Sequence, residues 1–212
     1  AMYFADVLKG DWQKVKELAH ELLNHVIFKI SGVIPSFKPL LQGRNQVVSL
    51  YIEQVSVGGV NYWCLSSYGS IPSAKETALC ISFEAIPCTE VIKALKNILD
   101  YVYRTNGVLL VHFGQLSMLQ TIASEDRTTQ LILDVLSNED RIVDLYPLAI
   151  KVYGKDVSLG DVVDIVSRFT RSKHRPLIPR CKGSEKKCAE EIKQVCSYIA
   201  RALYILATGK IT

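Results

Sequence analysis

The sequence predicts one α/β domain in which a mixed β-sheet is covered by helices. Three short segments rich in β-branched and aromatic residues follow one another early in the chain, separated by turn residues. Further strand patterns then alternate with segments of helical periodicity. Of the 212 residues, 49% are hydrophobic and 22% are charged, a composition typical of a globular chain that buries a core.

The first expected element is an amphipathic helix over residues 11–30. Asp11 is a suitable N-cap, and the apolar residues that follow it recur with the 3.6-residue period of a helix. Gly32 and Pro35 end the pattern. We treat Ala1, which precedes Met2, as an expression remnant and expect a single domain over residues 2–212.

Three strands are expected next, as an antiparallel meander. The first covers residues 47–55, and Gly58-Gly59 turns the chain into a second strand that begins at Val60. The third covers residues 77–83. We predict that the strand at 47–57 pairs antiparallel with the strand at 60–68, within a mixed five-stranded sheet.

Helices and strands alternate in the rest of the chain. Pro87 and Thr89 open an amphipathic helix, and Asn106-Gly107 turns the chain into a continuous apolar strand at 108–113. The remaining elements, in order, are a helical stretch to Leu136, a short strand at 141–146, a helix capped by Ser158 and a long closing helix that ends at Gly209. β-α-β connections of this kind add parallel strands to the sheet.

Basic residues are concentrated between residues 168 and 187, where Glu185 is the one acidic side chain. Such a block attracts polyanions through counterion release, and it is equally typical of a solvated loop, which Pro176 and Pro179 also suit. The candidate nucleic-acid-binding residues are Arg168, Arg171, Lys173, Arg175, Arg180, Lys182, Lys186 and Lys187.

The six cysteines form no CxxC pair, so reduced thiols are the expected state. Two alternatives stay open. One is a zinc site, and the other is a disulfide between Cys64 and Cys80 on neighbouring strands. The zinc ligands would be Cys181, Cys188, Cys196 and His174.

Several classes of protein are not indicated. The sequence contains no run of 18 apolar residues without a charge, so no membrane span is expected. No secretory signal pattern stands near its start. The chain has no phosphate-cradling glycine loop, nucleophile elbow or dinucleotide fingerprint. A cytoplasmic protein without membrane partners is therefore expected.

Several strings, in order, resemble motifs of the ribonuclease H-like superfamily, in its 3′–5′ exonuclease (DEDD, DnaQ-like) branch. Leu50-Tyr51-Ile52-Glu53-Gln54 is similar to the Phe-Asp-Ile-Glu-Thr-like first strand of that branch. His112-Phe113-Gly114, Val143-Asp144-Leu145-Tyr146-Pro147 and Ser158-Leu159 are similar to strings of one uncharacterised subgroup. The resemblance covers residues 45–207 and implies a three-strand meander followed by β-α-β units, with the helix at 11–30 as an addition.

The chemistry that this resemblance implies needs clustered carboxylates, which hold two divalent ions. Glu53 is present, but Tyr51 stands where the branch has an aspartate, and Ser117 stands near the place of a later acid. The closing helix carries no Asp or Glu from residue 192 to residue 209. Glu53 and Asp144 remain as candidate metal ligands, with His112 as a further catalytic candidate.

Three functions are left open by these residues. The first is a catalytically degenerate ribonuclease H-like domain that binds DNA or RNA through the basic segment and needs no cofactor. The second is an interaction or structural subunit that binds a protein partner. The third is an active nuclease with Mg²⁺ or Mn²⁺ on unusual ligands. Salt-dependent nucleic-acid binding separates the first two, and a metal titration with a cleavage assay isolates the third.

Overall fold

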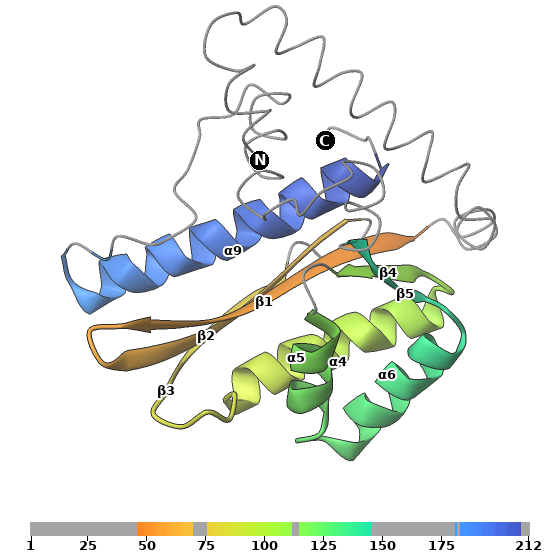
Figure 1. Cartoon of the computed structure of the whole chain (residues 1–212), viewed down its shortest axis with the longest axis horizontal. Coiled ribbons are helices and arrows are strands. Elements are labelled where there is room, and N and C mark those ends of the chain that lie inside the picture. The colour runs from red at the N-terminus through yellow and green to blue at the C-terminus, as the bar shows by residue number, and fades with distance from the viewer. Residues whose placement is uncertain (1–45, 70–75, 112–114, 146–180, 182, 209–212) are drawn as a thin grey trace, which may run out of the picture.

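A five-stranded mixed sheet forms the centre of the molecule (Figure 1). The computed structural model describes residues 46–69, 76–111, 115–145, 181 and 183–208. In space the strands follow the order β3-β2-β1-β4-β5. Their bounds are Val47–Val57 for β1, Val60–Gly69 for β2, Thr77–Ser82 for β3, Val108–Val111 for β4 and Ile142–Asp144 for β5.

The predicted hairpin is confirmed. β1 pairs antiparallel with β2 from Val57↔Val60 to Val48↔Gly69, and β2 pairs antiparallel with β3. Gly58 and Gly59 both have positive φ (58° and 78°), as a two-residue hairpin turn requires. Gly69 (φ 146°) ends β2 so close to β1 that a Cβ atom there would lie 2.2 Å from the carbonyl oxygen of Val47. Only glycine fits this position without moving the backbone.

Two parallel strands complete the sheet. β4 pairs with β1, and β5 pairs with β4, both in parallel. Each follows a helical connection, as β-α-β units require. The predicted mixed five-stranded sheet is therefore confirmed.

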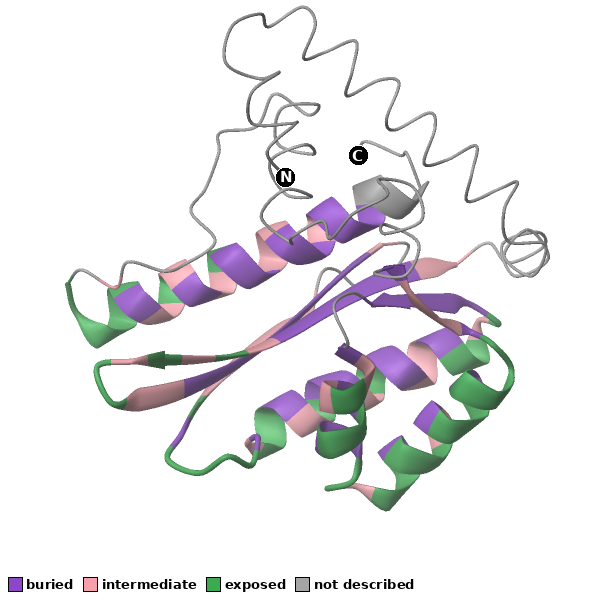
Figure 2. Cartoon of the chain, viewed as in Figure 1, coloured by how far each residue is buried: buried purple, intermediate pink, exposed green. Residues whose placement is uncertain are grey.

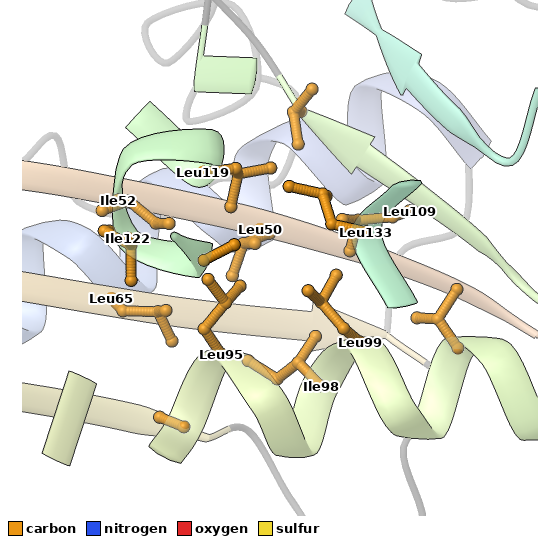
Figure 3. Close-up of a cluster of buried hydrophobic side chains, with 14 of the residues drawn as sticks. Leu50, Ile52, Leu65, Leu95, Ile98, Leu99, Leu109, Leu119, Ile122 and Leu133 are labelled. Carbon is orange, nitrogen blue, oxygen red and sulfur yellow. The ribbon is translucent and has the colours of Figure 1, made fainter. Parts of the chain in front are cut away.

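Three helices cover one face of the sheet: α4 (Thr89–Arg104), α5 (Gln115–Ala123) and α6 (Arg127–Asn138). The predicted apolar face of α4 is buried there, and Val91, Leu95 and Leu99 are fully covered. These side chains meet Leu50, Ile52 and Leu65 of the sheet and Leu119, Ile122 and Leu133 of the other two helices (Figure 3).

One long helix, α9 (Glu185–Thr208), covers the opposite face across β1, β2 and β3 (Figure 1). Its buried side chains include Ile192, Cys196, Ile199 and Leu203, which pack on Tyr51, Cys64 and other residues of the sheet. The described residues thus form three layers, with one apolar core on each side of the sheet (Figure 2).

Some elements differ from those expected. The helical stretch to Leu136 is two helices, because Asp126 caps a new one by accepting a hydrogen bond from the Thr129 N–H at 2.9 Å. The closing helix begins four residues before Ala189, and the short strand is limited to Ile142–Asp144. The expected helices at 11–30 and after Ser158, and residues 112 and 113 of the apolar strand, lie outside the described residues.

The expectation of six reduced thiols is wrong for four cysteines, since the structure joins Cys80 to Cys88 and Cys181 to Cys188. The turn after β3 brings the first pair together across eight residues. A Cys64–Cys80 bridge does not form, because Cys64 packs against α9 whereas Cys80 packs on the α4 side of the sheet. Within the described residues, no helix is long and apolar enough to cross a membrane.

Candidate functional site

The candidate site lies on β1, where Tyr51 and Glu53 face α9. Side chains alternate along a strand, so Leu50 and Ile52 enter the core under α4 while Tyr51 enters the core under α9. Glu53, two residues further, shares the face of Tyr51. Cys64 of β2 lies directly opposite Glu53 in the antiparallel register, and Cys196 of α9 lies close to both Tyr51 and Glu53. Four side chains from three elements therefore meet between the sheet and α9.

This site disfavours negative charge. Burial raises the pKa of Glu53, and a hydrogen bond from the Tyr51 hydroxyl partly opposes that rise. Burial, and then the neighbouring Glu53 carboxylate, raises the pKa of Tyr51 well above its usual range. The hydrogen bond with Cys64, and then burial, raises the pKa of the Cys196 thiol. Tyr51 and Cys196 therefore stay protonated and act as neutral hydrogen-bonding groups at physiological pH.

Cys64 and Cys196 are free thiols, and both are buried. A thiolate is the form that acts as a nucleophile or binds a metal, and this environment works against the thiolate of Cys196. The pair thus packs between β2 and α9, where a hydrogen bond joins the two side chains. Of the zinc ligands considered from the sequence, Cys181 and Cys188 are joined in a disulfide and His174 lies outside the described residues.

Polar contacts also hold α9 on the sheet. The Ser49 hydroxyl donates to the carbonyl oxygen of Ala200 in the middle of the helix. The hydroxyls of Ser66, Thr77 and Ser197 lie within 3.0–3.2 Å of one another and join β2, β3 and α9. These bonds satisfy polar groups that the helix covers, so the face that carries Glu53 is closed by packing over much of its length.

Gln115, at the start of α5, satisfies a backbone N–H group on the other edge of β1. β4 pairs with β1 only as far as Ser49↔Leu110, which leaves the Ile52 N–H beyond the end of β4. The side-chain oxygen of Gln115 accepts a hydrogen bond from this N–H at 2.7 Å, and the side chain is buried. Ser117, two residues later, is exposed on α5.

Asp144 lies on the opposite face of the sheet from Glu53. It pairs with Val111, whose side chain belongs to the core under α4, whereas Val143 and Leu145 pack in the core under α9. One strand, β4, separates β5 from β1, so the two backbones are about 10 Å apart at about 4.8 Å per strand. Through the register of β4, Asp144 is level with Leu50 of β1. Glu53 lies three residues beyond Leu50, which is about 10 Å further along the strand.

This placement gives no support to a metal ion shared by Glu53 and Asp144, since the ions of a two-metal centre lie about 4 Å apart. Among the residues that the structure describes, no group of three or more His, Cys, Asp or Glu side chains is arranged to hold a metal. Asp144 also takes part in an interaction within the protein.

The other sequence candidates fall in different places. His112 lies outside the described residues, as do Arg168, Arg171, Lys173, Arg175, Arg180 and Lys182. Lys186 and Lys187 are exposed in the first turn of α9, beside the Cys181–Cys188 disulfide.

Sequence reasoning did not connect Cys64, Cys196 and Gln115 with Glu53. A signal existed for Cys64, since Glu53 and Cys64 stand equally far from the Gly58-Gly59 turn and must face each other in a two-residue hairpin. No comparable signal in the sequence relates Cys196 or Gln115 to β1. Comparison of the chain with models of protein families, with curated proteins and with solved structures gave no match.

Proposed function

We propose that this chain is a ribonuclease H-like domain that has lost its nuclease centre and binds nucleic acid without cleaving it. The strand order β3-β2-β1-β4-β5, with an antiparallel meander followed by two parallel strands, agrees with the fold that the resemblance implies. The long closing helix over β1 and β2 agrees with it as well.

The proposed loss of catalysis rests on which side chains meet between β1 and α9. The resemblance implies an aspartate at Tyr51 and an acid on the closing helix. Among the described residues, Glu53 is instead the one carboxylate beside Tyr51, Cys64 and Cys196, and burial raises its pKa. The acids of α9 are Glu185, Glu190 and Glu191, all in its first turns. A single carboxyl group that resists ionisation cannot neutralise two divalent cations.

Nucleic-acid binding rests on the basic segment at 168–187. Its charges lie close together in the sequence, and its last two lysines, Lys186 and Lys187, are exposed at the start of α9. Lysine and arginine side chains that neutralise phosphates release counterions, so the affinity falls steeply with salt and depends little on sequence.

Affinity for single- and double-stranded DNA and RNA, measured between about 50 and 200 mM salt, tests the binding. The test variant replaces Arg171, Lys173, Arg175 and Arg180 by alanine. A matched control replaces Lys93, Lys96, Arg104 and Arg127 by alanine. These substitutions remove the same charge from α4 and α6. We expect the test variant alone to bind more weakly, with the slope of log K against log salt reduced by about one unit per lost contact.

Two outcomes would overturn the binding proposal. Absence of binding at the low-salt end would leave the interaction subunit as the better function. Equal binding by the test and control variants would place the contact surface outside the basic segment.

The loss of catalysis has its own test. We expect negligible cleavage of the same nucleic acids with Mg²⁺ or Mn²⁺. Metal-dependent cleavage that is lost in Glu53→Ala would restore the active-nuclease alternative. The cytoplasmic location stays a prediction.

A further inference from the structure

β3 is an edge strand whose outer side pairs with no strand among the described residues. The Ser67 N–H donates to the carbonyl oxygen of Glu76, which makes Ser67 and Glu76 a hydrogen-bonded pair of the antiparallel ladder. Hydrogen-bonded pairs recur at every second residue of an antiparallel strand, so the N–H and C=O groups of Ala78, Cys80 and Ser82 point toward β2. The N–H and C=O groups of Thr77, Leu79 and Ile81 therefore point to the open edge.

The residues of this strand lack the charges and prolines by which natural proteins protect exposed edges. Residues 77–83 contain no charged residue and no proline. The opposite edge, β5, is only three residues long and carries Asp144. At β3, apolar side chains are exposed instead: Ile81 is 42% exposed, Phe83 is 88% exposed and Ile86 is 50% exposed. Figure 2 shows the turn that follows β3 coloured as exposed.

The turn that carries Phe83 and Ile86 is fixed in place. The hydroxyl of the buried Ser82 lies 2.7 and 2.9 Å from the carbonyl oxygens of Glu84 and Ile86, and it accepts a bond from the Glu84 N–H. The Cys80–Cys88 disulfide closes the same turn. A turn whose backbone is already fixed loses little conformational entropy on binding, which favours a recognition surface.

The charge beside this edge indicates its partner. Glu84 follows the uncharged run and is exposed, whereas Glu76 at the other end stands next to Lys75 and accepts a hydrogen bond from Asn97 at 3.3 Å. Antiparallel pairing of two copies with these runs aligned would place Glu76 of each copy opposite Glu84 of the other, and like charges directly opposite each other are destabilising. An extended segment with apolar residues at its centre and Lys or Arg at the end that meets Glu84 is complementary to the same edge.

We propose that β3 is a strand-addition site for an extended segment of a partner protein, apolar at its centre and basic at the end that meets Glu84. Main-chain hydrogen bonds to Leu79 and Ile81 would supply affinity, and Phe83 and Ile86 would contact apolar side chains of the segment. This site is separate from the nucleic-acid-binding function proposed above, and either can hold without the other.

The probe is a blocked peptide, Lys-Lys-Thr-Val-Thr-Val-Thr-Lys-Lys, titrated onto the full chain and compared with the same peptide carrying Glu in place of Lys. We expect only the lysine peptide to bind. Ile81→Pro removes an outward N–H without breaking the ladder to β2, and it should weaken binding about tenfold, the effect of one lost hydrogen bond. Ile81→Thr keeps the N–H and should therefore lose less affinity than Ile81→Pro.

A second pair of variants tests the charges without changing the strand. Glu84→Lys should weaken binding of the lysine peptide about threefold at low salt, and Asp134→Lys, an equal change on α6, should not. Failure of the parent protein to bind the peptide, or equal binding by Ile81→Pro and Ile81→Thr, would overturn the proposal. So would self-association that Ile81→Pro abolishes, because the occupant would then be a second copy.

Hydrogen exchange at Leu79 and Ile81 gives a readout that does not depend on the variants. We expect both amides to exchange fast in the free protein and slowly with the lysine peptide bound. Slow exchange in the free protein would mean that a segment of this chain already covers the edge, and it would also overturn the proposal.

Discussion

Glu53 lies at a partly buried position, where burial disfavours the ionised form of its carboxyl group. Because burial raises its pKa, the folded state binds a proton at this carboxyl more tightly than the unfolded state does. The contribution of Glu53 to stability therefore falls as the pH rises from the ordinary pKa of 4.5 through the raised value in the folded protein.

Glu53→Gln removes this titration. We expect the free energy of unfolding of the variant to increase relative to the parent as the pH is raised from about 4 to about 7. Urea unfolding of both proteins at several pH values measures the difference. Tyr51→Phe removes the hydrogen bond that lowers the pKa of Glu53 and should make the pH dependence steeper. A difference between Glu53→Gln and the parent that does not change with pH would contradict this interpretation.

The residues of the site show how far sequence reasoning reaches at this scale. The resemblance of residues 50–54 to a first-strand motif draws attention to Glu53 and Tyr51, and strand geometry then predicts that both lie on one face. The raised pKa of Glu53 was beyond prediction, since it depends on α9, which lies more than 130 residues later and contributes Cys196. Asp144 was identified as an acid near the end of a strand, but the face to which it points follows from the register with β4.

At the scale of elements, the buried Arg141 joins the end of α4 to the start of β4. Its guanidinium donates to the carbonyl oxygens of Val102 and Tyr103 in the last turn of α4, and its Nε donates to the carbonyl oxygen of Gly107 at 2.9 Å. Val102 and Gly107 are buried. The carbonyl oxygens of Val102 and Tyr103 also accept from the N–H groups of Gly107 (2.9 Å) and Asn106 (3.3 Å), so loss of Arg141 removes one donor from each of them and removes the side-chain donor of the Gly107 carbonyl oxygen.

Arg141→Met keeps much of the side-chain volume and removes every donor. We expect the free energy of unfolding to fall by about 2–4 kcal/mol, as for other buried hydrogen-bond networks. Glu139, the ion-pair partner of Arg141 at 2.8 Å, has a half-exposed side chain, so Glu139→Gln should cost less than about 1 kcal/mol. Chemical denaturation of both variants checks the prediction, and equal losses would show that the ion pair carries the effect.

Element prediction succeeded where a pattern was local. The period of α4, the two glycines of the hairpin and the Asn106-Gly107 turn each identify a structure within a few residues. It failed at Asp126, because the pattern before and after this residue is helical, whereas the extended backbone of Asp126 and its side-chain bond to Thr129 separate α5 from α6. It also missed the Cys80–Cys88 pairing, which depends on the path of the turn between β3 and α4.

At the scale of the whole molecule, the sheet carries an apolar core on each face, and both cores use β1 and β2. Loss of either core would expose one face of the same strands. The described residues should therefore unfold as one cooperative unit. The order of elements along the chain was enough to predict this layered arrangement, whereas the position of α9 on the face opposite α4 came from the structure.

Leu99→Ala and Ile199→Ala test this cooperativity from opposite faces. Both side chains are buried, so each substitution should lower the free energy of unfolding by about 2–5 kcal/mol. Since the sheet separates them, the double variant should lose the sum within about 0.5 kcal/mol. Circular dichroism and tryptophan fluorescence should give coincident urea transitions for all three proteins. Separate transitions for the two substitutions would mean that the faces unfold independently.

The tip of the β1–β2 hairpin offers a practical site for protein engineering. Gly58 and Gly59 are exposed, and apart from the adjacent residues no heavy atom lies within 4 Å of the place where a side chain would begin at either glycine. Exposed tips of this kind accept inserted sequence more readily than packed segments do. A reporter peptide or fluorescent domain inserted between these glycines would leave the β3 edge, the basic segment and both ends of the chain unmodified for binding experiments.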